Sequence, residues 1–161
     1  MCQQSWERGE QRVTTSTVGA MPITADHVGR RYPPTAPYEV SAAKIAEFAG
    51  ALGDDSPAYT GPEPIAPPTF VAVISSAAWQ SMFDDPELGL ALRRIVHGDQ
   101  RFTYQRPLRA GDTVQAALTI DRVRNRGASD IISASVQVTT VEGEQLCTAE
   151  ATFFHAHEGD A

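Results

Sequence analysis

Few side chains in the central part of this sequence could transfer a proton near neutral pH. Asp54 and Tyr59 stand five residues apart in a stretch crowded with proline and glycine, and His97 stands directly before Gly98 and Asp99, where a strand is expected to begin. A histidine in such a place is also typical of a structural or surface role. Asp54 has a second interpretation, as the turn residue that ends a helix. Asp54 and His97 therefore stay open as acid–base groups or as structural residues.

The cysteines and the remaining histidines favour neither redox nor metal chemistry. Cys2 and Cys147 cannot constitute a disulfide framework. No pair of Cys or His residues has the spacing of metal ligands apart from His155 and His157 near the C-terminus. We therefore expect no metal and no cofactor, and we expect a reduced, cytoplasmic protein.

Length and composition are those of one compact domain. The chain has 161 residues, of which 42% are hydrophobic, and this suits a single core with no room for a second. The net charge is -7, and the basic residues are scattered among acidic ones, which argues against a nucleic-acid partner. No apolar run reaches the ~18 to 20 residues that a membrane span needs, so no membrane association is expected.

The chain is predicted to consist of an N-terminal extension and a domain. Residues 1–20 are polar and without period, so we expect disorder there, with an ordered arm as the alternative. Charged residues such as Glu7 and Arg8 stand where a signal peptide needs an apolar run. The domain then covers residues 21–161, and Met21 is an alternative start of translation.

Two helices are predicted before the strands begin. After a Pro-rich extended segment over residues 21–37 and a short strand over 38–40, Ser41 is a good N-cap and Gly53 a good end of a helix. Between them the apolar residues recur at helical spacing: Ile45, Phe48, Ala49 and Leu52. Pro68 then stands where a helix often has a first-position proline, and a second helix is predicted over residues 69–83. That helix is apolar on nearly every side, which predicts that the protein encloses it.

The second half of the chain has the alternation typical of strands. From about residue 94 onward apolar and polar residues alternate, and turn signals centred on Gly111, Gly127 and Gly143 separate the runs. The pattern predicts an antiparallel meander of roughly four long strands. A curved antiparallel sheet wrapped around a long central helix explains both the alternation and the all-round apolar helix. The predicted fold class is therefore α+β, with a single hot-dog fold.

Several segments, in the right order, resemble the MaoC-like (R)-hydratase/dehydratase family. Residues 45–59, which end in GDDSPAY, resemble the family's hydratase motif, in which a helix ends in Gly-Asp-x-Asn-Pro-x-His. Residues 65–70 resemble the segment that leads into the central helix, and residues 102–112 the strand and turn that begin the sheet. Residues 32–40 and 96–100 narrow the resemblance to N-terminal-type actinobacterial members. These include uncharacterised proteins and the A- and C-type subunits of the heterodimeric mycolic-acid (3R)-hydroxyacyl-ACP dehydratase.

The resemblance also implies that the chemistry of this family is impaired here. Family members hydrate an enoyl thioester with the Asp and the His of the motif; Asp54 matches the Asp, but Tyr59 stands at the position of the His. A tyrosine with a pKa of about 10 is a poor base at neutral pH. The family's oxyanion hole uses a glycine N–H at the start of the central helix, where this chain has Pro67-Pro68 and therefore no donor.

Three functions are compatible with this pattern. The leading hypothesis is a non-catalytic subunit that binds an acyl chain and pairs with a catalytic MaoC-like hot-dog subunit as a (3R)-hydroxyacyl-thioester dehydratase or enoyl hydratase. The alternatives are a homodimeric hydratase that uses Asp54, and a non-enzymatic module that binds acyl-CoA or an acyl carrier. In each, the predicted substrate-binding residues are Tyr59, Pro68, Thr69, Trp79 and Phe102, of which Trp79 and Phe102 are also candidates for ordinary core packing.

Overall fold

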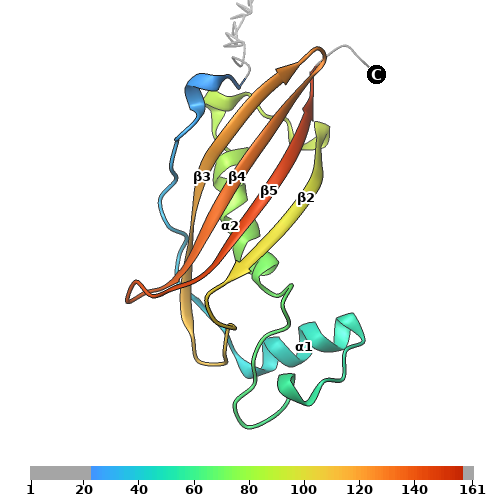
Figure 1. The fold of residues 1–161 in the computed structure, drawn as a ribbon, viewed down its shortest axis with the longest axis vertical. Helices are drawn as coiled ribbons and strands as arrows, with labels where there is room; N and C mark the ends of the chain where they lie inside the picture. Colours follow the sequence, from blue (N-terminus) through green and yellow to red (C-terminus); the bar gives the residue numbers. More distant parts are fainter. Residues whose placement is uncertain (1–22, 158–161) are drawn as a thin grey trace, which may run out of the picture.

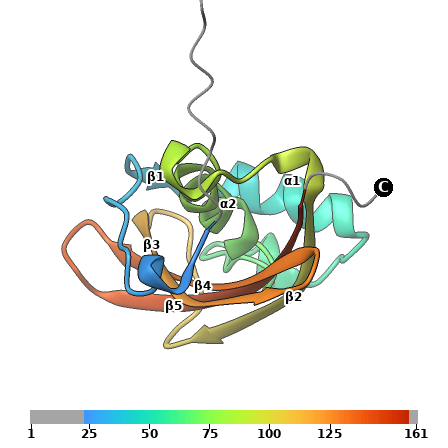
Figure 2. The same cartoon turned by 90° about the horizontal axis from the view of Figure 1, so that it is seen from above.

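The computed structural model describes residues 23–157, so the extension predicted over residues 1–20 lies outside the described residues. The described helices and strands are β1 Tyr38–Glu39, α1 Ala42–Leu52, α2 Val71–Phe83, β2 Ile95–Tyr104, β3 Thr113–Arg126, β4 Ser129–Thr140 and β5 Gln145–Ala156 (Figure 1). The strands form one curled antiparallel sheet, and both helices lie on the same side of it (Figure 2). Neither of these helices has the length and apolar character that a membrane span requires.

The order of the strands differs from the predicted meander at one strand. The order is β1-β3-β4-β5-β2, so β3, β4 and β5 are successive neighbours, but β2 pairs with β5 and not with β3. The alternation of apolar and polar residues along a strand indicates which face is buried, but it does not indicate which strand lies beside it. Residues 105–112 connect β2, at one edge of the sheet, to β3, which lies beyond β5 and β4 in the strand order. Arg106 anchors this connection with two hydrogen bonds to Asp112 (2.8 and 3.0 Å) and two to Glu144 (2.8 and 2.9 Å).

α1 begins and ends where the sequence predicts. The hydroxyl of Ser41 accepts a hydrogen bond from the Lys44 N–H, and Gly53 adopts a left-handed φ of 68°, which a residue with a Cβ rarely adopts. Of the predicted apolar face, Ile45 and Ala49 are buried, whereas Leu52 is 53% exposed. Leu52 lies in the last turn, beyond the part of α1 that packs on the core, so the prediction is wrong for this residue.

α2 begins later and is less enclosed than predicted. The Phe70 N–H donates to the Pro67 carbonyl in a turn, and the helix begins only at Val71, so Pro68 is not its first residue. One side of α2 is buried: Val71, Ile74, Ser75, Ala78 and Met82. The opposite side carries exposed apolar residues, among them Val73, which is 38% exposed. The prediction of all-round enclosure is therefore wrong for the single chain, because the sheet covers α2 from one side only (Figure 2).

The Pro-rich segment before β1 lies along the edge of β3, in agreement with its predicted extended course. Its backbone N–H groups donate to β3 carbonyls at regular intervals, from Gly29 to Ile120 (2.8 Å) and from Tyr32 to Leu118 (2.9 Å). These bonds continue the pairing that β1 makes with the start of β3. The segment therefore covers much of an edge that would otherwise have unpaired backbone groups.

A buried carboxylate connects several elements at the end of the sheet remote from α1. Asp130 has no exposed surface. Its carboxylate accepts a hydrogen bond from Asn125 Nδ2 (2.6 Å) and lies 2.8 Å from His157 Nε2 and 3.4 Å from His155 Nδ1. His155 Nε2 accepts the Ala91 N–H (3.2 Å), so its Nδ1 carries the proton that points to Asp130. The cluster thus joins β3, β4, β5 and the loop before β2.

We predict that Asp130→Ala lowers the free energy of unfolding at pH 7 by about 3 kcal/mol, because it leaves the partners of a buried charge unpaired. Burial alone would raise the pKa of Asp130, but the contacts with His157, Asn125 and His155 outweigh it and lower that pKa. A carboxylate of this kind stabilises the fold above its unfolded pKa of about 3.9, and this stabilisation is lost as the pH falls through the folded value.

Urea denaturation of both proteins between pH 7 and pH 3 measures this contribution. The difference between wild type and Asp130→Ala should shrink toward acid. Asp99→Ala, at an exposed position on β2, is the control and should stay within about 0.5 kcal/mol of wild type. A difference that does not depend on pH would contradict the role given to the charge.

Candidate functional site

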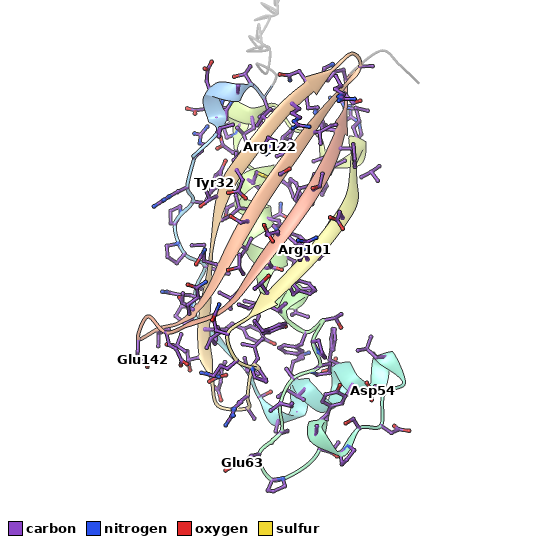
Figure 3. The ribbon with its side chains drawn as sticks, in the orientation of Figure 1. Tyr32, Asp54, Glu63, Arg101, Arg122 and Glu142 are labelled. Carbon is purple, nitrogen blue, oxygen red and sulfur yellow. The ribbon has the colours of Figure 1, made fainter. Side chains whose placement is uncertain are left out.

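Asp54 and Tyr59 lie together in the loop that follows α1. The Asp54 N–H donates to the Ala49 carbonyl (3.0 Å), and its Oδ1 accepts the Ser56 N–H (3.1 Å), so Asp54 does serve as the turn residue that ends the helix. Its other oxygen, Oδ2, accepts the hydroxyl of Tyr59 (3.3 Å). Asp54 is exposed, beside α1 at one end of the molecule (Figure 3). The carboxylate thus has a structural role and also contacts the residue predicted as its partner.

Tyr59 is positioned by a short 3-10 helix over Pro57–Tyr59. The proline begins this turn, and the Ser56 side chain accepts the Ala58 N–H, which fixes the ring relative to Asp54. Burial raises the pKa of the Tyr59 phenol, and the negative charge of Asp54 raises it further. A phenol with a raised pKa stays protonated at neutral pH, so Tyr59 donates a hydrogen bond and does not accept a proton.

A side chain from β2 forms a hydrogen bond with the turn that precedes α2. Phe70, in the N-cap position, forms no side-chain cap. The hydroxyl of Tyr104, the last residue of β2, donates to the Pro68 carbonyl (2.6 Å) and connects the end of β2 to the turn before α2. Burial strongly raises the pKa of the Tyr104 phenol.

An apolar cavity of about 270 Å³ lies between this loop, the amino end of α2 and the end of β2. It is lined by two tyrosines and by aliphatic residues and prolines: Ala58, Tyr59, Ile65, Ala66, Pro68, Tyr104 and Pro107. Tyr59 and Pro68 belong to the predicted substrate-binding set. Such a cavity, with few polar groups, is typical of a site for a hydrocarbon ligand.

The other candidates from the sequence lie outside this lining. Thr69 is exposed in the turn before α2. Trp79 lies eight residues into the helix from Val71, about 12 Å along its axis, and its ring contacts Phe153 edge to face at 5.5 Å. Phe102 is half-buried on β2 and packs on the core. The geometry therefore brings only part of the predicted set to one cavity, and the binding roles remain predictions.

His97 lies in an aromatic cluster and not beside Asp54. Its ring stacks on Phe153 with centroids 5.0 Å apart and meets Trp79 edge to face at 5.1 Å, and Nε2 lies 3.0 Å from the Asp99 carbonyl. These contacts give His97 the structural role that its sequence position also allowed. Within residues 23–157 no three His, Cys, Asp or Glu residues are arranged to hold a metal ion. His155 and His157 both contact Asp130 instead.

Tyr104 and the residues around it line the cavity but are not among the residues predicted from the sequence. Tyr104 stands two positions after Phe102 on the same face of β2, and this spacing is a signal that could have added it to the set. Ile65 and Ala66 reach the cavity because they pair with the segment that follows β2. Ile65 forms an isolated bridge with Arg109, and the Ala66 N–H donates to the Leu108 carbonyl (2.8 Å).

A curled antiparallel sheet that packs against a long helix defines the class of hot-dog proteins. The sequence pattern of the FAS1-like, dehydratase domain region matches residues 26–149. A UPF0336 protein of Cutibacterium acnes is 52% identical over 142 residues, which are 88% of this chain and 100% of that relative. A UPF0336 protein of Saccharopolyspora erythraea is 42% identical over 141 residues, 82% of this chain and 90% of the relative. The chain belongs to the FAS1-like dehydratase family, in its UPF0336 group.

Solved structures agree with the predicted single hot-dog fold. A chain of the HadBC (3R-hydroxyacyl-ACP dehydratase) complex from Mycobacterium tuberculosis superposes with a TM-score of 0.71 at 28% identity, over 82% of this chain and 99% of that one. The (R)-hydratase PhaJ1 from Pseudomonas aeruginosa has a TM-score of 0.59 at 17% identity, over 81% and 83%. The second likeness concerns the fold alone. The resemblance to MaoC-like proteins and the hot-dog assignment are confirmed.

The contact between Asp54 and Tyr59 leads to a prediction about the Tyr59 phenol. Because the Asp54 charge contributes to the raised pKa of Tyr59, Asp54→Asn should lower that pKa toward about 10, and the part due to burial should remain. NMR titration of the tyrosine ring carbons measures it. Asp55→Asn, at the exposed neighbouring position, should leave the pKa of Tyr59 unchanged. An equal effect of both substitutions would contradict the specific contact.

Proposed function

We propose that this chain is the acyl-chain-binding, non-catalytic subunit of a heterodimeric (3R)-hydroxyacyl-thioester dehydratase or enoyl hydratase, with a catalytic MaoC-like hot-dog subunit as its partner. The observation that carries the proposal is the pairing of Asp54 with a phenol. Tyr59 donates a hydrogen bond to Asp54 (3.3 Å) and keeps its proton. Because a tyrosine occupies this position, no imidazole is available there to take up or release a proton. Losing a positioned acid–base group lowers a rate by about 10² to 10⁴.

The amino end of α2 supports the same proposal. Hydration or dehydration of an acyl thioester needs a donor that stabilises the negative charge on the carbonyl oxygen. Pro67 and Pro68 have no N–H, and the Phe70 N–H already donates to Pro67. A site without the family's histidine and without an N–H at the position of the family's glycine, but with an apolar cavity, is suited to holding an acyl chain.

The free edge of the sheet and one relative favour a hot-dog partner. Among residues 23–157, β2 has no strand on its outer side, and Val96 on this strand is 64% exposed. An edge of this kind is normally paired or protected. The solved relative at 28% identity comes from a complex named for (3R)-hydroxyacyl-ACP dehydratase, which supports a two-subunit assembly for this chain.

The test compares three samples: the pure chain, a catalytic hot-dog subunit encoded by a neighbouring gene, and the two co-expressed. We expect the pure chain to hydrate crotonyl-CoA negligibly and the co-expressed pair to do so at least about 100-fold faster. Robust turnover by the pure chain would overturn the proposal and favour a homodimeric hydratase.

Two further variants identify which subunit performs the chemistry. In the pair, Asp54→Asn should leave the rate within about twofold, as should the control Asp55→Asn, whereas replacing the partner's motif Asp should abolish turnover. A loss of about 100-fold or more with Asp54→Asn would assign a catalytic role to this residue. Tight binding of acyl-CoA without turnover in any pairing would indicate a non-enzymatic acyl-binding module.

A further inference from the structure

The outer face of the sheet, on the side away from both helices (Figure 2), carries a polar groove of about 300 Å³. Short side chains on the central strands β4 and β5, Ser133 and Thr152 among them, form its floor, and charged side chains on β3 and β2 form its rims. Arg122 and Arg101, one on each rim, lie on either side of the two central strands (Figure 3). The groove shares no lining residue with the apolar cavity.

The strand register arranges the charges of this groove in two rows of opposite polarity. Directly paired residues of neighbouring strands share a face. The first row runs from β3 to β2 through Arg122, Ser133, Thr152 and Asp99. In the second row Arg101 on β2 pairs with Glu150, and Glu150 pairs with Ser135, whose hydroxyl donates to Asp121 on β3 (3.0 Å). The β3 end is therefore positive in the first row and negative in the second, and the β2 end is the reverse.

These rim charges find no counter-ion within the chain. Among residues 23–157 the side chains of Arg101, Arg122 and Asp99 form no ion pair with any other side chain. The two ends of a row are three strand spacings apart, about 14 Å, so they do not meet within one molecule. Burial raises the pKa of Asp121, and the charge of Glu150 raises it further, although the Ser135 hydroxyl acts against this rise. Such a shift is expected of a carboxylate with no cation beside it.

A twofold axis parallel to the strands, between β4 and β5, brings each rim charge opposite its counterpart on a second copy. Such an axis exchanges the β3 end and the β2 end of every row and keeps the position along the strands. Arg122 then faces Asp99 of the second copy, and Arg101 faces Asp121 of the second copy. Because a twofold contact is isologous, each pair occurs twice.

The central strands meet under the same axis without like charges in contact. Ser133 faces Thr152 of the second copy, and Glu150 faces Ser135 of the second copy. Sheets that pack face to face lie about 10 Å apart, and the short side chains of β4 and β5 leave room for that approach. The longer arginines at the rims extend across the gap toward the aspartates.

An apolar contact completes the match at the end of the sheet remote from α1. The next row runs through Arg124, Ile131, Phe154 and Val96. Phe154 is 41% exposed, and its ring lies against Gly98, where a Cβ would overlap it. The axis places Phe154 over Ile131 of the second copy, so an exposed aromatic ring gains an apolar neighbour.

We infer that the outer face of the sheet is a self-association surface, on which a second copy of this chain packs back to back through the two arginine–aspartate pairs. Both signs of charge are present at the rims, which suits an identical face and does not suit a partner of one sign. The inference is independent of the proposed function, because it uses neither the apolar cavity nor the backbone edge of β2. Exposed ion pairs are individually weak, so we expect the association at high protein concentration and not in dilute solution.

Sedimentation equilibrium of the pure chain over a wide range of concentrations tests the surface. Arg122→Glu places like charges opposite each other in both symmetric contacts and should weaken self-association about tenfold or more, as should Asp99→Arg. Arg109→Glu makes the same charge change at an exposed position between β2 and β3, outside the groove, and is the matched control. Its association constant should stay within about twofold of wild type.

An equimolar mixture of the two weakened variants provides the decisive measurement. When Arg122→Glu pairs with Asp99→Arg, opposite charges face each other again, so the mixture should associate within about threefold of wild type. The double variant that carries both substitutions should self-associate to the same extent. A disturbed fold in either variant would not produce this recovery.

Several results would overturn the inference. A wild type that stays monomeric at every concentration would exclude the surface, and association that neither reversal weakens would place the contact elsewhere, such as the β2 edge. Failure of the mixture to recover would contradict the facing of Arg122 and Asp99. Hydration of crotonyl-CoA by the co-expressed pair should be the same with Arg122→Glu as with wild type, so the proposed function stands or fails separately.

Discussion

The packing of α2 on the concave face of one curled sheet is the constraint on which the rest of the structure depends. Val71, Ile74 and Met82 are buried there, and each such side chain contributes roughly 1.5 to 3 kcal/mol relative to exposure. Because one sheet has one concave face, the opposite side of α2, with Val73, and the outer edge of β2 stay open in the single chain. The same packing holds the amino end of α2 against the end of β2, where the cavity lies.

The site is built from contacts that stabilise the fold and at the same time limit its chemistry. Asp54 ends α1 and accepts the Tyr59 hydroxyl, so the carboxylate holds a turn and faces a group that does not act as a base at neutral pH. Pro68 ends an irregular loop, and its carbonyl receives the Tyr104 hydroxyl. Each of these contacts satisfies a polar group inside the protein.

The features that the sequence predicts correctly are those that depend on neighbouring residues alone. Ser41 and Gly53 were identified as the ends of α1 because capping requires only the neighbouring backbone. Alternation gave the faces of the long strands, but the pairing of β2 with β5 depends on a connection whose course Arg106 helps to fix through distant Glu144. The exposure of Leu52 was not predictable either, because helical spacing does not reveal where the core ends.

For the candidate site, the sequence by itself determined the residue types: a carboxylate, a tyrosine five residues later and a pair of prolines before a helix. With these residue types the site has no imidazole at position 59 and no backbone N–H at positions 67 and 68. Both absences follow from the residue types and do not depend on folding. Only the tertiary structure decided that Tyr104 bonds to the turn before α2 and that this turn borders an apolar cavity. Tyr104 and Pro68 are 36 residues apart, and a hydrogen bond across that separation exists only once β2 has paired and α2 has packed.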